Sequence, residues 1–231
     1  MNRSEKSYIL SIESSDAVCS VALGNSDHLL GEYTLRIRNI HNERLGVFIH
    51  ELFREHQLTM QEIGYIALSA GPGSYTGLRI GFSLAKGIAY PDSIPVVALP
   101  SLEISAYKSR FIGNPIVSVI NAHRQELYVC DYTWKDGRLI SNSVVSIATI
   151  NQFRKKWMND NITLTGSAVP VVLSFLDEKE LPSHWHIASE DFWYTTGKDI
   201  YHYFMHVKNH QLLKEYNLEE PLYVRDFKGT Y

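Results

Sequence analysis

The chain has 231 residues, of which 45% are hydrophobic and 20% are charged, and its formal net charge is −3. This composition is ordinary for a globular protein and leaves room for one large domain or two small ones. No block of five or six like charges indicates nucleic-acid binding by charge alone. No apolar run approaches the roughly 18 residues that a membrane span needs.

The first half of the chain alternates between strand and helix patterns. Turn residues separate three short apolar runs, which predicts an antiparallel meander. In the next segment Leu45, Phe48, Ile49, Leu52 and Phe53 form one apolar stripe at helical spacing. The predicted elements are strands at 8–13, 18–23 and 28–36, a helix over about 41–57, a strand at 65–69, a helix at 74–89 and a strand at 96–99.

The second half begins after Gly113-Asn114-Pro115 and repeats the strand-rich pattern. Asp136-Gly137 predicts a tight hairpin turn between two strands. Near the end, Ile200, Phe204, Val207 and Gln211 fall on one line of a predicted helix. The expected elements are strands at 116–120, 126–134 and 139–147, a helix at 150–158, a strand at 162–165 and a helix at about 197–215. We expect two domains, 1–110 and 111–231, with the last helix packing back on the first.

The stretch SAGPGSYTGLRIG, residues 69–81, joins a strand to a helix through a glycine-rich turn. Helix N-termini of this kind often bind phosphate. However, no lysine stands where a P-loop requires one, and the spacing of Gly71, Gly73 and Gly77 differs from that of a dinucleotide-binding turn. Pro72 also removes one N–H donor. The sequence therefore does not favour a nucleotide site formed by this loop alone.

Small residues recur at every fourth position of the following helix, at Gly77, Gly81, Ala85 and Ala89. Successive positions drift by only about 40°, so these residues line one side of the helix. Such a ridge allows another helix to approach closely, as small residues do in membranes. The sequence leaves two interpretations open. The ridge is either a docking surface for a second polypeptide or is covered within the subunit itself.

Four segments together resemble the TsaB (YeaZ) family, which has the actin/sugar-kinase/Hsp70-like (ASKHA) α/β fold of two related subdomains. The loop and helix are the most distinctive of these segments, and Ile120-Asn121-Ala122-His123 departs from the Ile-Asp-Ala-Arg expected there. The matching segments are ILSIESSDAVCSVAL, ALSAGPGSYTGLRIGFSLAKGIAY, INAHRQELYVCDY and PLYVRDF.

The resemblance implies a role in making threonylcarbamoyladenosine in tRNAs that read ANN codons, with the chemistry in a TsaD-like partner. It also implies a homodimer, a TsaE-like ATPase in the assembly, contact with tRNA only through the complex, and a cytoplasmic location. ATP or ADP is expected only at the joint surface with the partner. The implied interface comprises Leu45, Ile49, Gly73, Ser74, Tyr75, Thr76, Gly77, Arg79, Ile80, Gly81, Leu84 and Ala85.

Several residue patterns favour a non-catalytic chain without its own metal. Ser101 and Ser105 stand where TsaD-like proteins carry a His-x-x-x-His pair, and hydroxyls are poor ligands for such a metal. His202, His206 and His210 recur at helical spacing without a carboxylate or cysteine beside them. Two alternative functions remain open for the chain. It could be an actin-like ATP-dependent phosphotransferase or a metalloprotease-like hydrolase.

The chain also carries isolated acidic and thiol groups. Glu13, Asp16 and Asp131 are candidate acids, but no partner base is recognisable by spacing. Cys19 and Cys130 lie in apolar segments and are expected to be buried free thiols, as in a reducing cytosol.

Overall fold

Two compact units divide the chain. The computed structural model describes residues 7–37, 40–113, 115–176, 181–216 and 220–224. Unit 1 comprises Met1–Ile104 and Thr195–Pro221, and unit 2 comprises Ser105–Tyr194 and Leu222–Tyr231. The chain therefore leaves unit 1 inside a helix, α3 (Ser101–Lys108), that the sequence did not predict. The boundary therefore lies between residues 104 and 105, before the expected boundary between 110 and 111.

Unit 1 is built on a five-stranded sheet of order β3-β2-β1-β4-β5. The first three strands are antiparallel, as the meander predicts, while β4 and β5 run parallel to β1. The two central strands β1 and β4 are almost wholly buried, which explains their continuous apolar runs. The strands are β1 (Tyr8–Glu13), β2 (Val18–Gly24), β3 (Leu29–Arg36), β4 (Ile63–Gly71) and β5 (Val96–Pro100).

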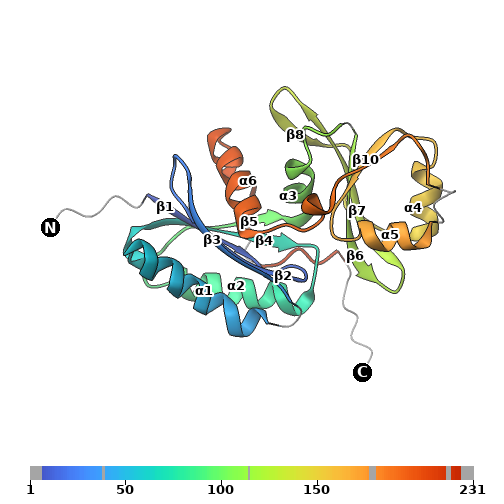
Figure 1. Ribbon diagram of the computed structural model, residues 1–231. Helices are drawn as coiled ribbons and strands as arrows, with labels where there is room; N and C mark the ends of the chain where they lie inside the picture. Colours follow the sequence, from blue (N-terminus) through green and yellow to red (C-terminus); the bar gives the residue numbers. More distant parts are fainter. Residues whose placement is uncertain (1–6, 38–39, 114, 177–180, 217–219, 225–231) are drawn as a thin grey trace. The chain divides into compact units, whose positions relative to one another are not determined.

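Helices cover both faces of this sheet (Figure 1). On one face lie α1 (His41–His56) and α2 (Tyr75–Ala89), joined to the strands by loops and by the 3-10 turn Met60–Glu62. On the other face α6 (Gly197–Asn209) contacts β1 and β2, and its residues Ile200, Phe204 and Val207 are fully buried. The C-terminal helix thus belongs to unit 1.

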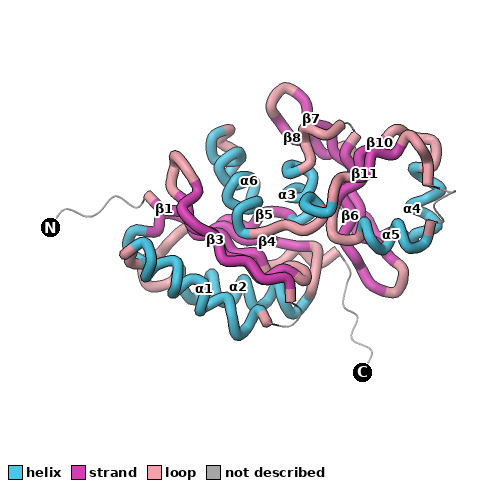
Figure 2. The backbone as a smooth tube through the Cα atoms, in the orientation of Figure 1, coloured by secondary structure: helices cyan, strands magenta, loops and turns pink. Residues whose placement is uncertain are grey.

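Unit 2 repeats the same plan. Its sheet has the order β11-β10-β6-β7-β8, which read from β8 is the unit 1 order, and β9 pairs with β7. One face packs on α4 (Ile150–Trp157) and α5 (Val169–Phe175), seen beside β6 and β10 in Figure 2. The strands are β6 (Ile116–His123), β7 (Glu126–Lys135), β8 (Arg138–Ser141), β9 (Ser146–Thr149), β10 (Ile162–Thr165) and β11 (Trp185–Ile187). The recurrence fits the predicted ASKHA fold class.

The structure corrects four details of the sequence-based assignment. The predicted strand at 139–147 is broken into β8 and β9, and the last helix ends at Asn209 before a short 3-10 turn, η4 (Leu213–Tyr216). Helix α5 and strand β11 had no recognisable periodicity because each is short. Gln211 is exposed and has left-handed backbone, so it does not continue the buried line. Among the described helices none is long and apolar enough to cross a bilayer.

Candidate docking face on unit 1

A groove runs between α1 and α2 on the outer side of the unit 1 helix layer and encloses about 710 Å³. Six of the twelve predicted interface residues line it: Leu45, Tyr75, Thr76, Arg79, Ile80 and Leu84. The other four lining residues are His41, Asn42, Gly46 and Ser83. Because Ile80 and Leu84 are only half-buried, apolar surface remains open to solvent in this groove.

Gly46 is the least expected member of the groove. It lies in the interior of α1, where glycine destabilises a helix by roughly 0.5–1 kcal/mol relative to alanine. A Cβ placed there would meet nothing within 4 Å, so the fold itself does not require a glycine. Its neighbour Val47 is 44% exposed on the same stretch of helix. Both features are those expected of a helix surface that another backbone approaches closely.

Arg79 and His41 bring polar character to the groove. The Arg79 guanidinium carbon lies 3.9 Å from the centroid of the Tyr75 ring, so the flat cation is oriented by an aromatic face. A guanidinium held in this way suits a carboxylate on a partner. His41 is buried at the start of α1, with its Nε2 3.0 Å from the carbonyl oxygen of Val18. This contact fixes the end of α1 against β2.

The prediction that the small-residue ridge of α2 is open to a second helix is wrong. Gly77, Gly81 and Ala85 are buried. A Cβ at Gly77 would overlap the carbonyl oxygen of Ser14, and one at Gly81 would overlap the Ser14 hydroxyl. The ridge is small because α2 lies directly against the turn that follows β1. The interpretation that the subunit covers this side itself is therefore the correct one.

Predicted interface residues that are outside the groove, or that form its buried floor, have structural roles. A Cβ at Gly73 would overlap the carbonyl oxygen of Ser15, and the exposed Ser74 caps α2 by accepting a hydrogen bond from the Gly77 N–H at 3.2 Å. Ile49 belongs to the core beneath α1, and Leu45 is 1% exposed and forms the floor of the groove. The exposed part of this candidate face is therefore smaller than the predicted set of residues and includes Gly46, Ile80 and Leu84.

Glu13 anchors the turn on which α2 rests. Its carboxylate is fully buried, and Oε1 accepts hydrogen bonds from the Ser15 N–H, the Ser15 hydroxyl and the Ser69 hydroxyl at 2.6, 2.7 and 2.9 Å. Oε2 accepts one from the Thr195 hydroxyl at 2.9 Å. Both oxygens are thus occupied within unit 1. Desolvation by burial raises the pKa of this carboxyl, although the four hydrogen bonds oppose the shift.

The raised pKa of Glu13 predicts a pH-dependent effect of Glu13→Gln. Since the folded chain binds this proton more tightly than the unfolded chain, Glu13 makes the free energy of unfolding fall as pH rises from about 4.5 through the raised pKa. We expect the stability of the wild type relative to Glu13→Gln to be greatest near the acid end and to shrink as pH rises through the raised pKa. Urea unfolding of both proteins across this range measures it. A difference that grows with pH would contradict the assigned direction.

A family model described as "TsaD: tRNA N6-adenosine threonylcarbamoyltransferase" matches residues 35–203, well over half of the chain. The chain belongs to this family. Its curated relatives include TsaB proteins, as the sequence motifs indicated. The TsaB of Bacillus subtilis (strain 168) is 34% identical over 131 residues, which are 57% of this chain and 57% of that protein. The TsaB of Haemophilus influenzae is 26% identical over 189 residues, which are 74% and 76% of the two chains.

The fold of the TsaB family is also seen among solved structures. A structure of YeaZ from Pseudomonas aeruginosa superposes with a TM-score of 0.75 at 21% sequence identity, covering 94% of this chain and 100% of that one. The match to the Bacillus relative spans only a little over half of either protein. Together with the repeated sheet order, the superposition confirms the ASKHA fold class.

Two serines mark how this TsaB-family chain differs from the His-x-x-x-His pattern of TsaD-like proteins. Ser101 is the first residue of α3, Ser105 lies one turn further along the helix, and both are buried. The Ser101 hydroxyl accepts from the Gly71 N–H at 3.1 Å and donates to the Ser15 hydroxyl at 3.2 Å. Ser101 therefore tethers α3 to the turn beside Glu13. Within the described residues no group of three or more His, Cys, Asp or Glu side chains is arranged to hold a metal ion.

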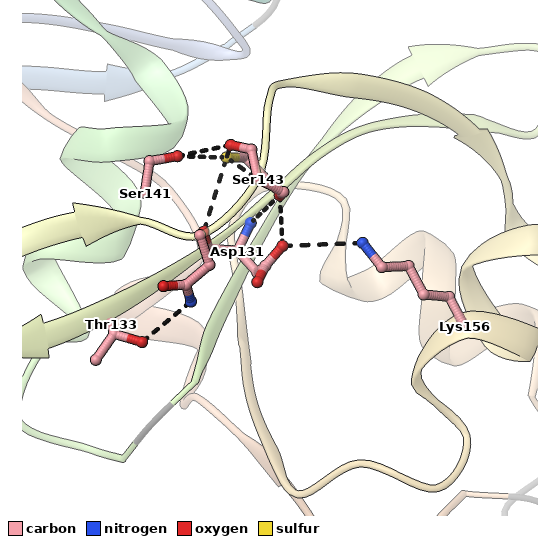
Figure 3. Close-up of polar contacts among 7 residues, drawn as sticks. Asp131, Thr133, Ser141, Ser143 and Lys156 are labelled. Carbon is pink, nitrogen blue, oxygen red and sulfur yellow. Dashed lines mark hydrogen bonds and ion pairs between the residues drawn. The ribbon is translucent and has the colours of Figure 1, made fainter.

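Asp131, one of the candidate acids, makes contacts within unit 2 that stabilise the local fold (Figure 3). Its Oδ1 accepts a hydrogen bond from the Ser143 hydroxyl at 2.5 Å and lies 3.8 Å from Nζ of Lys156. Its carbonyl oxygen accepts from the Asn142 N–H at 2.9 Å, and the Asn142 amide donates to the Thr133 hydroxyl at 3.0 Å. These contacts hold the segment that interrupts the predicted strand between β8 and β9. Cys130 and Cys19 are buried free thiols, as predicted.

The two histidines of α6, His202 and His206, and the C-cap residue His210 do not share one environment. His202 is exposed, while His206 and His210 are half-buried with ring centroids 4.3 Å apart. The ring of His210 contacts the carbonyl oxygen of His206 through Nδ1, and the ring of His206 stacks on Tyr203. The Tyr203 hydroxyl in turn donates to Glu103, as does that of Tyr216. These contacts pack η4 against the end of α6. Arg225 of the PLYVRDF segment lies outside the described residues.

Proposed function

We propose that this chain is a non-catalytic partner subunit of the complex that forms N6-threonylcarbamoyladenosine next to the anticodon of ANN-decoding tRNAs. It binds and activates a TsaD-like catalytic subunit through the face made by α1 and α2. The observation that carries the proposal is the groove, whose half-exposed Ile80 and Leu84 lie with a helical glycine, Gly46, that the fold does not need. Membership of the family supplies the reaction to which the groove is assigned.

The residues favour a partner over a catalyst. Hydroxyls at Ser101 and Ser105 replace the two imidazoles that would face a metal, and Ser101 already bonds within unit 1. The oxygens of Glu13 are likewise engaged by four donors in a fully buried position. A catalytic acid needs access to substrate, which this environment denies.

The same face serves a homodimer when the partner is absent, and a TsaE-like ATPase joins the assembly. We assign both the homodimer contact and the contact with the catalytic subunit to this face, because its exposed apolar surface favours burial against another protein. ATP or ADP, if held, lies at the joint surface with the catalytic subunit, since no nucleotide motif in this chain is complete. The proposed site of action is the cytoplasm.

Reconstitution tests this function directly. We expect the purified chain to leave an ANN-decoding tRNA transcript unmodified, to co-elute with a TsaD-like protein, and to increase modification by that protein together with a TsaE-like ATPase. Mass spectrometry of the digested tRNA and light scattering measure these results. Turnover by the chain alone, tight ATP binding with phosphate transfer, or a stoichiometric metal with peptidase activity would overturn the proposal. The last two outcomes would favour the phosphotransferase or the hydrolase.

A further inference from the structure

Three aromatic rings and one guanidinium gather on unit 2, outside every feature described above. Tyr107, Arg110 and Phe111 come from the end of α3 and the turn after it, and Trp134 comes from β7. The Arg110 guanidinium carbon lies 3.9 Å from the ring centroid of Tyr107, 4.2 Å from that of Phe111 and 5.6 Å from that of Trp134. These four residues are the aromatic cluster.

The cluster is oriented by its own contacts yet remains open. Tyr107 and Phe111 each meet Trp134 edge to face, with centroids 5.8 and 6.2 Å apart. Arg110 donates from Nη1 to the carbonyl oxygen of Tyr107 at 2.8 Å, which holds its plane near the rings. Phe111 is nevertheless 76% exposed, so most of its ring contributes nothing to the core of unit 2. A fixed cation beside an exposed ring is a surface on which a flat π system can stack.

The charges around the aromatic cluster indicate which kind of ligand would stack on it. The two segments that supply the rings, residues 105–113 and 132–139, carry Lys108, Arg110, Lys135 and Arg138 against the single carboxylate of Asp136. Lys135 and Arg138 face each other across the β7–β8 hairpin and are both exposed. The chain as a whole has a net charge of −3, so this excess of cations is local. Aromatic faces beside local positive charge favour a polyanion that carries exposed bases.

We propose that the aromatic cluster is a stacking site for an unpaired base of the tRNA, with Phe111 and Arg110 as the contact residues. The proposal rests on the proposed function for the identity of the RNA. It departs from the expectation that this chain reaches tRNA only through the complex. Bases in RNA loops are recognised by stacking on aromatic side chains and on guanidinium planes, which is the pair that this surface presents. The cations of the hairpin would attract the neighbouring phosphates.

Binding of an ANN-decoding tRNA transcript tests the site, measured at fixed salt for the chain alone and for its mixture with the TsaD-like subunit. We expect Phe111→Ala to weaken tRNA binding about tenfold, because one stacked base is lost. Phe111→Trp should restore binding, since it keeps an aromatic face. Val144→Ala is the matched control, because Val144 is an apolar residue of unit 2 that is 87% exposed; it should bind tRNA as the wild type does. The double change Lys135→Ala with Arg138→Ala should lessen the salt dependence of binding.

Unchanged tRNA binding by Phe111→Ala overturns the proposal, as does the absence of measurable tRNA binding to the wild-type chain and mixture alike. Weaker association of Phe111→Ala with the TsaD-like subunit, at equal tRNA affinity, also overturns it and assigns the cluster to a protein contact. A failure of the stacking site can be told apart from a failure of the proposed function. Failure of the two proteins to associate, with Phe111-dependent tRNA binding by the chain alone, removes the proposed partner and leaves the stacking site.

Discussion

Gly77→Ala is expected to destabilise unit 1 by about 3 kcal/mol, although alanine is the better helix former. The added methyl group would overlap the carbonyl oxygen of Ser14, and this oxygen belongs to backbone that cannot rotate away. The N-cap of α2 also binds this turn, because the Ser74 N–H donates to the carbonyl oxygen of Ser15 at 2.6 Å. Relief therefore requires α2 to move off the sheet. The midpoint of urea unfolding measures the effect.

Gly87→Ala is the matched control for that change. Gly87 lies in the same helix, is exposed, and has nothing within 4 Å of where its Cβ would stand. Alanine there should raise the free energy of unfolding by about 0.5–1 kcal/mol, because only the helix propensity changes. Equal effects of the two substitutions would show that α2 does not lie as close to the Ser14 carbonyl as the structure has it.

Gly46→Arg is expected to weaken association with the TsaD-like subunit by about a hundredfold, close to 2.7 kcal/mol, while making the isolated chain more stable. A long charged side chain would project from α1 into the groove, where the partner's surface has to come close. Arginine is a far better helix residue than glycine and would meet nothing of its own chain at Cβ. Loss of binding together with a gain in stability cannot be produced by misfolding. Calorimetric titration and urea unfolding give the two quantities.

Two controls bracket this substitution. Gly46→Ala adds one methyl group and should bring the same gain in helix stability with a much smaller loss of affinity. Val144→Arg places the same charged side chain on an exposed apolar position of unit 2 and should leave association unchanged. If Gly46→Arg binds the TsaD-like subunit as tightly as Val144→Arg does, the groove between α1 and α2 is not the docking face.

Much of the fold was predictable because its signals are local. The apolar runs of β1 and β2, the stripe of α1 and the Asp136-Gly137 turn each carry their own pattern, and all three kinds of element formed as predicted. The break between β8 and β9 was not predictable. It depends on Asp131 reaching Ser143 twelve residues away, and a hydrogen bond of that kind leaves no periodic trace in the sequence.

The candidate site was only partly predictable, because a sequence pattern does not identify the neighbours of a residue in space. The spacing of Gly77, Gly81 and Ala85 correctly indicated a close approach of backbone, but spacing does not say which backbone approaches. The structure supplies the turn at Ser14 as the neighbour. Conversely, Gly46 was missed because a lone glycine in a helical pattern has many explanations. The structure shows open space around Gly46, which is the observation that makes it a candidate contact residue.

Hydrogen exchange on the wild-type chain, with and without a saturating TsaD-like subunit, tests the docking claim most directly. We expect amides of α1 and α2 to gain protection in the complex, most strongly around Gly46 and from Tyr75 to Leu84, where α1 and α2 line the groove. Formation of the complex with unchanged exchange in both helices, and protection confined to other parts of the chain, would contradict it.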